Sequence, residues 1–147
     1  MNIGQIIEIY PQRPHLVILG AGASKDSMPN GDAEGRPLPV MNEFISTLGL
    51  TDYIGRIEGV PKTDNIEDVY SWLANQEQFA EERFVVENEI REYFSNITLP
   101  DTLTKYDLLV LSLRQKDCIA TFNWDGLLVQ AYQRMQKITT DLPQMVF

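Results

Sequence analysis

The chain has 147 residues, of which 44% are hydrophobic, and a formal net charge of −9. This length and composition predict one globular domain with a substantial core, and the negative charge argues against binding to nucleic acid or to an anionic membrane. The single cysteine, Cys118, excludes an internal disulfide and a four-cysteine zinc site. No apolar run approaches ~20 residues and no signal peptide is recognisable, so we expect a cytoplasmic protein without a membrane span.

A short strand buried on both faces is predicted over residues 16–19, because four apolar residues follow one another there. The sequence continues as Gly20-Ala21-Gly22-Ala23-Ser24. Glycine permits a tight reversal and a close approach to the backbone, and a helix that starts after such a turn points free N–H groups at an anion. The turn therefore has two interpretations: a cradle for a diphosphate, or a Gly-rich connection from a core strand to the next element.

His15, the only histidine, comes just before this strand. Ligands of open α/β sheets bind at the carboxyl ends of the strands, and His15 would lie roughly 13–16 Å from that end. We therefore expect it to be structural or merely exposed. Residues 25–39 are rich in Gly and Pro and predict a loop long enough to fold over a ligand, in which Lys25 and Arg36 are expected to be solvated more often than bound to phosphate.

Helical periodicity recurs through the middle of the chain. Apolar spacing predicts helices over residues 40–48, 52–57, 66–73, 79–97 and 103–113, with Asn65 or Asp64 as the cap of the third. The glutamates of the segment 79–97 lie mostly outside its apolar stripe, so we interpret them as a solvated face. Arg114 and Lys116 would complement the dipole at the end of the last of these helices.

A second buried strand is predicted over residues 118–122, with Cys118 as a small core residue rather than a nucleophile. The polar corner Asn123-Trp124-Asp125-Gly126 follows, and helical spacing resumes at Leu127. Asn and Asp are favoured helix caps, which is one explanation of the corner. The other is that Asn123 and Asp125 face the glycine turn, as they would if the two strands were parallel neighbours. Residues 144–147 predict a third strand.

The two strand-end motifs together resemble the signatures of the sirtuin superfamily. The glycine turn is similar to the G-A-G-A-S motif of that superfamily. Thr121-Phe122-Asn123-Trp124-Asp125 is similar to its T-Q-N-I-D signature, in the aromatic form of SIR2-like bacterial proteins that consume NAD, many of them in anti-phage defence. Ile66-Glu67-Asp68-Val69 and Trp72-Leu73 also resemble that branch, and the resemblance spans roughly residues 15–147.

This resemblance implies an α/β fold of one SIR2-like domain over residues 1–147: a Rossmann-like open parallel sheet with helices on both faces. The single cysteine leaves out the zinc module of the family, and we expect no other metal. NAD would bind at the carboxyl edge of the sheet, with Gly20, Ala21, Gly22, Ala23 and Ser24 at the diphosphate and Thr121 among the cofactor-binding residues. Asn123 would position the attacking water near the nicotinamide ribose, and Asp125 would contact the ribose or the nicotinamide. The reaction would be hydrolysis of NAD to nicotinamide and ADP-ribose through an oxocarbenium-like state.

Two departures from the family pattern shape this expectation. The absence of four cysteines argues against a protein deacylase. The family's catalytic histidine follows the second signature, whereas no histidine follows Asn123 here. We therefore expect that residue beyond Phe147, so that this chain would be the N-terminal part of a longer domain, with the C-terminal part missing and no activity of its own.

Other functions stay open at this point. A non-catalytic module that senses NAD or ADP-ribose would carry the same motifs, and homo-oligomers or further domains are compatible with them. A Rossmann dehydrogenase has less support, because it needs an acid at a strand end about 20 residues after the glycines. Glu43 has that spacing but lies in a helical pattern.

Overall fold

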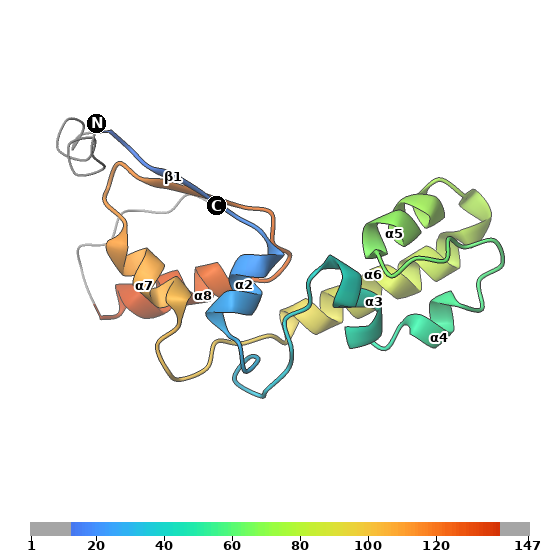
Figure 1. The fold of residues 1–147 in the computed structure, drawn as a ribbon, viewed down its shortest axis with the longest axis horizontal. Helices are drawn as coiled ribbons and strands as arrows, with labels where there is room; N and C mark the ends of the chain where they lie inside the picture. Colours follow the sequence, from blue (N-terminus) through green and yellow to red (C-terminus); the bar gives the residue numbers. More distant parts are fainter. Residues whose placement is uncertain (1–12, 139–147) are drawn as a thin grey trace, which may run out of the picture.

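The computed structural model describes residues 13–138 (Figure 1). The predicted strand at 144–147 therefore lies outside the described residues. The described elements are β1 (Leu16–Leu19), α2 (Ala21–Ser27), η1 (Met41–Glu43), α3 (Phe44–Thr47), α4 (Thr51–Ile54), α5 (Ile66–Ala74), η2 (Glu77–Phe79), α6 (Ala80–Ser95), α7 (Lys105–Ser112), β2 (Cys118–Thr121) and α8 (Leu127–Gln136), where η denotes a 3₁₀ helix. No helix in this range is long and apolar enough to cross a membrane.

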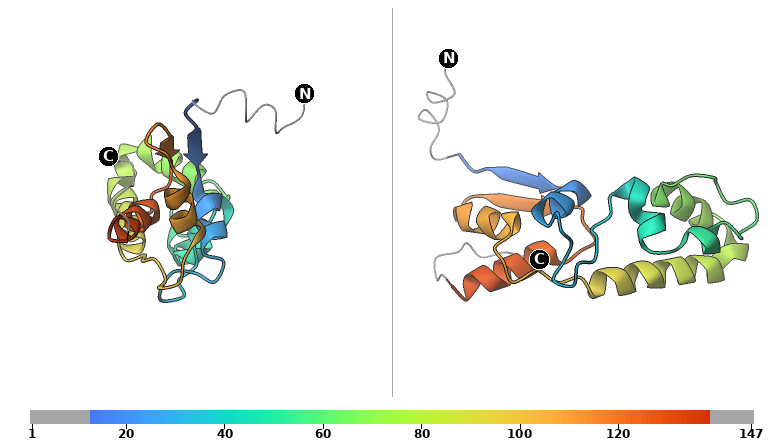
Figure 2. Two further views of the ribbon diagram at one scale, coloured as in Figure 1. Left: turned by 90° about the vertical axis from the view of Figure 1, so that its left-hand side faces the viewer. Right: turned by 60° about the horizontal axis from the view of Figure 1, so that its bottom comes forward.

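The strands β1 and β2 form a two-stranded parallel sheet, in which Leu16 pairs with Cys118 and Leu19 with Thr121. A parallel pair requires a crossover, and here every described helix except α8 lies between the two strands in the sequence. The helices α2, α7 and α8 lie on the same side of the pair (Figure 2). The fold is thus α/β, with one helical layer against the two strands within residues 13–138.

The prediction that both strands are buried on both faces is wrong. Alternate side chains of a strand point to opposite faces. Leu19 and Ile119 pack against the core beneath the sheet, whereas Leu16 and Ile18 are each 63% exposed. Cys118 is also exposed rather than a core residue. The described helices cover only one face, and an apolar run of residues does not record how many layers pack against it.

Two hydrophobic cores hold the structure together. The strand core lies under the sheet and comprises Met28, Leu38, Ile97, Tyr106, Val110, Leu127, Leu128, Ala131, Tyr132 and Met135. The helical core is enclosed by the remaining helices and comprises Phe44, Ile45, Leu50, Ile54, Ile57, Ile66, Val69, Leu73 and Val86. The long helix α6 runs from one half of the molecule toward the other (Figure 1), and Phe94 near its end packs against both cores.

Most predicted helices are confirmed, and their ends differ where side chains decide them. Helix α5 begins after Asn65, whose Oδ1 accepts the N–H of Glu67 at 2.9 Å, as the cap prediction requires. Helix α7 begins at Lys105 rather than at residue 103, because Thr104 Oγ1 accepts the N–H of Asp107 and the Asp107 carboxylate accepts the N–H of Thr104.

Three segments differ from the sequence prediction. Residues 21–27 form helix α2, so the turn predicted over residues 20–24 and the first residues of the loop predicted over 25–39 are helical instead. The segment 40–48 divides into η1 and α3. Arg114 and Lys116 lie beyond the end of α7, and Arg114 instead holds Asp117 through a contact of 2.8 Å.

Candidate functional site

Both motifs lie at the carboxyl end of the sheet, because Leu19 and Thr121 pair in the parallel register and each motif follows its strand directly. Their side chains are in contact. Asn123 Nδ2 donates to Ser24 Oγ at 2.8 Å, and Ser24 Oγ donates to Asp125 Oδ2 at 2.7 Å. The glycine motif of residues 20–24 and the Asn-Trp-Asp corner therefore form one site, although about a hundred residues separate them.

The hydrogen-bond directions in this network follow from a count of protons. Ser24 has one hydroxyl proton, and it goes to the Asp125 carboxylate, which is acceptor-only when ionised. The Tyr106 hydroxyl lies 2.7 Å from Ser24 Oγ and must therefore donate to it. Asn123 Nδ2 donates to Ser24 and, at 3.1 Å, to Tyr106. If the Asn123 amide were flipped, its Oδ1 would face Ser24 Oγ, whose only proton is already donated to Asp125, so that two acceptors would meet. The network therefore fixes the orientation of the amide.

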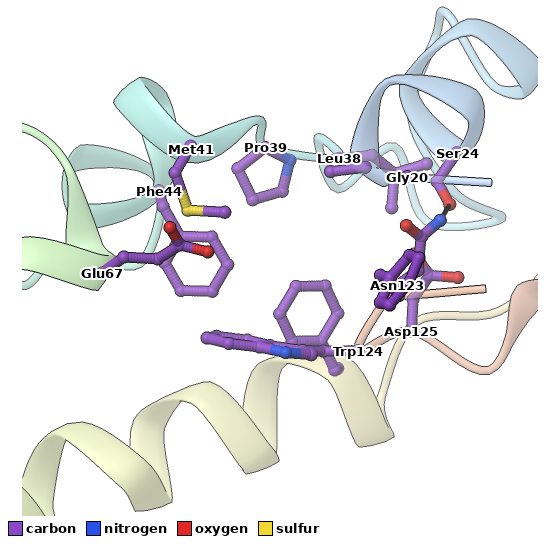
Figure 3. A pocket seen from close by; sticks show the side chains of 13 residues that line it. Gly20, Ser24, Leu38, Pro39, Met41, Phe44, Glu67, Asn123, Trp124 and Asp125 are labelled. Atoms are coloured by element: carbon purple, nitrogen blue, oxygen red, sulfur yellow. Dashed lines mark hydrogen bonds between the residues drawn. The ribbon is translucent and has the colours of Figure 1, made fainter. Parts of the chain in front are cut away.

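This orientation leaves the carbonyl oxygen of Asn123 without a partner. Asn123 Oδ1 is buried and has no hydrogen-bond partner among the described residues. Figure 3 shows that this oxygen points away from Ser24. A buried acceptor without a donor costs about 1–3 kcal/mol and calls for an explanation. A hydroxyl or amide donor from a bound molecule would satisfy it.

Tyr106 supports the network from helix α7. Burial raises the pKa of its phenol and the charge of Asp125 raises it further, whereas the hydrogen bonds that join the phenol to Ser24 and to Asn123 act in the opposite direction. The phenol thus stays protonated at neutral pH and remains a donor to Ser24. Sequence reasoning placed Tyr106 only in an apolar stripe. The available signal was that a buried tyrosine hydroxyl requires a hydrogen-bond partner.

Helix α2 starts at the site. Gly20 is its N-cap, with extended backbone, and Ala23 N–H donates to Gly20 O at 2.8 Å. The N–H groups of Ala21 and Gly22 precede the first intrahelical bonds and point out of the helix start. Neither Gly20 nor Gly22 has a positive φ, and a Cβ at either would meet nothing within 4 Å. These glycines are thus not required for a tight reversal. They leave open space beside the backbone amides.

A cavity of about 230 Å³ opens in front of these residues (Figure 3). One end is polar, with Ser24, Asn123 and Asp125. The rest of the lining is largely apolar and comprises Leu38, Pro39, Met41, Phe44, Glu67, Phe94, Phe122 and Trp124. Leu38 lies beside Gly20, whereas Met41, Phe44 and Glu67 lie across the cavity from Ser24 (Figure 3), in the half of the molecule that holds the helical core. The site therefore lies between the two halves.

The structure brings together five of the eight predicted site residues: Gly20, Ala21, Ser24, Asn123 and Asp125 line the cavity. The other three do not line it. Gly22 is exposed and Ala23 packs against the strand core, whereas Thr121 Oγ1 accepts the N–H of Asn123 at 3.1 Å and shapes the corner from outside. Sequence reasoning missed Phe44 as a lining residue, because only the tertiary fold brings α3 to the end of the sheet. It also missed Trp124, although this residue lies inside the predicted corner.

The three cationic or titratable residues weighed in the sequence lie elsewhere. Lys25 pairs with Glu43 at 2.5 Å, and Arg36 pairs with the buried Asp32 at 2.8 Å. His15 lies at the other end of β1, where its backbone N–H donates to Asp117 and its side chain is 71% exposed. The prediction that His15 is structural or exposed is therefore confirmed.

The fold and the site define an α/β protein with a partly polar, partly aromatic cavity at the carboxyl ends of two parallel strands. Within residues 13–138 no group of three or more His, Cys, Asp or Glu side chains is arranged to hold a metal ion. Comparisons with protein-family models, with curated proteins and with solved structures find no match to this chain.

Proposed function

We propose that this chain is an NAD-binding domain of the SIR2-like type and that the protein hydrolyses NAD to nicotinamide and ADP-ribose. The proposal includes a wider Rossmann-like sheet around β1 and β2. The observation that carries it is the buried Oδ1 of Asn123, which has no partner among the described residues, together with the start of helix α2, where no side chain caps the first N–H groups. A molecule that offers both a hydroxyl donor and an anion suits this pair of features, and NAD has both in its ribose and its diphosphate. A role in anti-phage defence depends on the sequence resemblance alone.

The residues present fit part of such a molecule. The backbone amide of Ala21, which lines the cavity, would take a diphosphate oxygen, and Asn123 Oδ1 would accept from a ribose hydroxyl. The cavity of about 230 Å³ is below the ~300–1,000 Å³ usual for drug-sized ligands, so it would enclose one half of a dinucleotide.

The contacts of Asp125 favour a positioning role for it. Its Oδ2 accepts from Ser24 and its Oδ1 accepts the N–H of Leu127 at 3.1 Å, at the start of α8. Both carboxylate oxygens are therefore engaged by the protein itself. We assign Asp125 to holding Ser24 and the corner, and leave the direct ligand contact to Asn123.

Calorimetric titration of NAD into the chain tests the proposal. We expect binding, and a loss of about 3- to 10-fold in affinity for Asn123→Ala, which is the worth of one ordinary hydrogen bond. Asn75→Ala, at an exposed position after α5, is the control and should leave the affinity unchanged. Absence of NAD binding, or equal affinities of the Asn123→Ala variant and the unchanged chain, would refute the proposed function.

A sensor that binds NAD or ADP-ribose without turnover is the second candidate. It is favoured by the contacts of Asp125 and by the lack of a histidine among the described residues that line the cavity. Nicotinamide release separates the two, since a sensor binds NAD and releases no nicotinamide. The dehydrogenase is disfavoured, because Glu43 pairs with Lys25 and does not line the cavity.

A further inference from the structure

The end of the cavity away from Ser24 has a preformed aromatic wall. The Trp124 ring meets Phe44 edge to face, with 5.5 Å between ring centroids, and meets Phe94 in the same way at 6.3 Å. Phe44 is buried, whereas Trp124 is 52% exposed although two rings hold it in place. Figure 3 shows Trp124 and Phe44 side by side along the cavity. The indole thus presents a fixed aromatic surface that no described side chain covers fully.

The charge at this cavity has one sign. Glu67 and Asp125 are among the lining residues, and no Lys or Arg of the described chain is. The Glu67 carboxylate lies beside Phe44 (Figure 3) and has no hydrogen-bond or ion-pair partner within the part of the chain that the structure describes. Its backbone N–H, by contrast, is taken by the Asn65 cap. The carboxylate is therefore free to meet a ligand.

An aromatic face and a free carboxylate together favour a cation. A cation within about 6 Å of an indole face is attracted by the ring quadrupole, and a nearby carboxylate adds direct Coulomb attraction. A neutral planar ring would gain only the stacking contact. The formal charge of −9 on the whole chain acts in the same direction at longer range.

We propose that Phe44, Glu67 and Trp124 form a subsite for a planar organic cation, which prefers a charged pyridinium ring to a neutral ring of the same shape. The inference rests on the proposed function in one respect: NAD carries such a charged ring on its nicotinamide half, and the reduced dinucleotide does not. The subsite would then hold the oxidised nicotinamide, at the end of the cavity away from the start of α2.

Two small probes test the subsite without the rest of the dinucleotide: the 1-methylnicotinamide cation and neutral nicotinamide, each titrated calorimetrically into the chain. We expect the cation to bind at least about fivefold more tightly than the neutral ring, with a preference that weakens as salt is added. Glu67→Gln should lower the affinity for the cation by about fivefold and leave the affinity for nicotinamide unchanged. Trp124→Leu should weaken it by about 2- to 30-fold, and Trp124→Phe, which keeps a ring, by less.

Asp68→Asn is the matched control. Asp68 lies in the same first turn of α5 and carries the same charge, but it is not part of the cavity lining. Its removal should leave the affinity for the cation unchanged. Equal affinities for the two probes, no binding of the cation, or equal effects of Glu67→Gln and Asp68→Asn would overturn the inference.

Titration with ADP-ribose separates this inference from the proposed function, because ADP-ribose lacks the pyridinium ring. If ADP-ribose binds and Asn123→Ala weakens it while the cation does not bind, the subsite is refuted and the proposed function stands. If the cation binds as described but neither NAD nor ADP-ribose does, the proposed function is refuted and the subsite stands.

Discussion

Replacing Ser24 by alanine should destabilise the protein by about 3 kcal/mol. Ser24 is 2% exposed and its hydroxyl forms three hydrogen bonds, one to the carboxylate of Asp125 and two with the neutral groups of Tyr106 and Asn123. At ~1 kcal/mol for each neutral bond and ~1.5 kcal/mol for the charged one, their loss costs about 3.5 kcal/mol. The better helix propensity of alanine within α2 returns about 0.5 kcal/mol.

Ser27→Ala is the matched control for this prediction. Ser27 is also buried in α2, but its hydroxyl accepts one bond, from the N–H of Tyr106 at 3.0 Å. The same arithmetic gives a cost of about 0.5 kcal/mol. Urea unfolding followed by far-ultraviolet circular dichroism measures both variants, and an unchanged m-value shows that the two free energies are comparable. If Ser24→Ala costs no more than Ser27→Ala, the proton assignment of the network is refuted.

Three further predictions concern the sheet and the buried ion pair. Ile18→Thr should change the free energy of unfolding by less than about 0.5 kcal/mol, because Ile18 is exposed. Ile119 faces the strand core, so Ile119→Thr should lower that free energy by about 1–2 kcal/mol. Equal costs in urea titrations would mean that both faces of the sheet are covered. Arg134→Met should lower the free energy of unfolding by about 3 kcal/mol or more, because it leaves the fully buried carboxylate of Asp107 without the hydrogen bond that Arg134 donates at 3.0 Å. Arg83→Met removes an exposed ion pair with Glu87 on α6, at 3.7 Å, and should lower it by under about 1 kcal/mol. Burial pushes the pKa of Asp107 up, but its hydrogen bonds, above all that from Arg134, hold this pKa below the ordinary 3.8. The stabilisation is therefore complete above about pH 4 and is lost as the pH falls through the folded pKa, so acid titration of the unfolding free energy should have a shallower slope in Asp107→Asn.

The elements that depend on neighbouring residues could be read from the sequence. Asn65 caps α5 because its side chain reaches an N–H two residues away, and such a contact is written in the local sequence. The meeting of Ser24 with Asn123 follows from one rule, that parallel strands end at the same edge of a sheet. It required only that the two apolar segments be neighbours, which the register of β1 and β2 provides.

Contacts between distant segments could not be read in this way. Phe44 and Trp124 come together at 5.5 Å from segments eighty residues apart, and nothing local to either marks the contact. The exposure of Ile18 depends on which helices cover the sheet and not on the residue itself. Thr121 lies inside the recognised motif, yet its hydroxyl oxygen accepts the backbone N–H of Asn123 and does not line the cavity.

The cavity lies between the half of the molecule that holds the strand core and the half that holds the helical core. Ser24 stands on the half that contains the strands, Glu67 stands on the half that contains α5, and Phe94 packs against the cores of both. A ligand that contacts both halves binds only when the two halves are folded and in place. Its binding therefore raises the free energy of unfolding of the chain. By the same linkage, a substitution that weakens the helical core around Leu73 should lower the affinity for a ligand in the cavity, although Leu73 does not line the cavity.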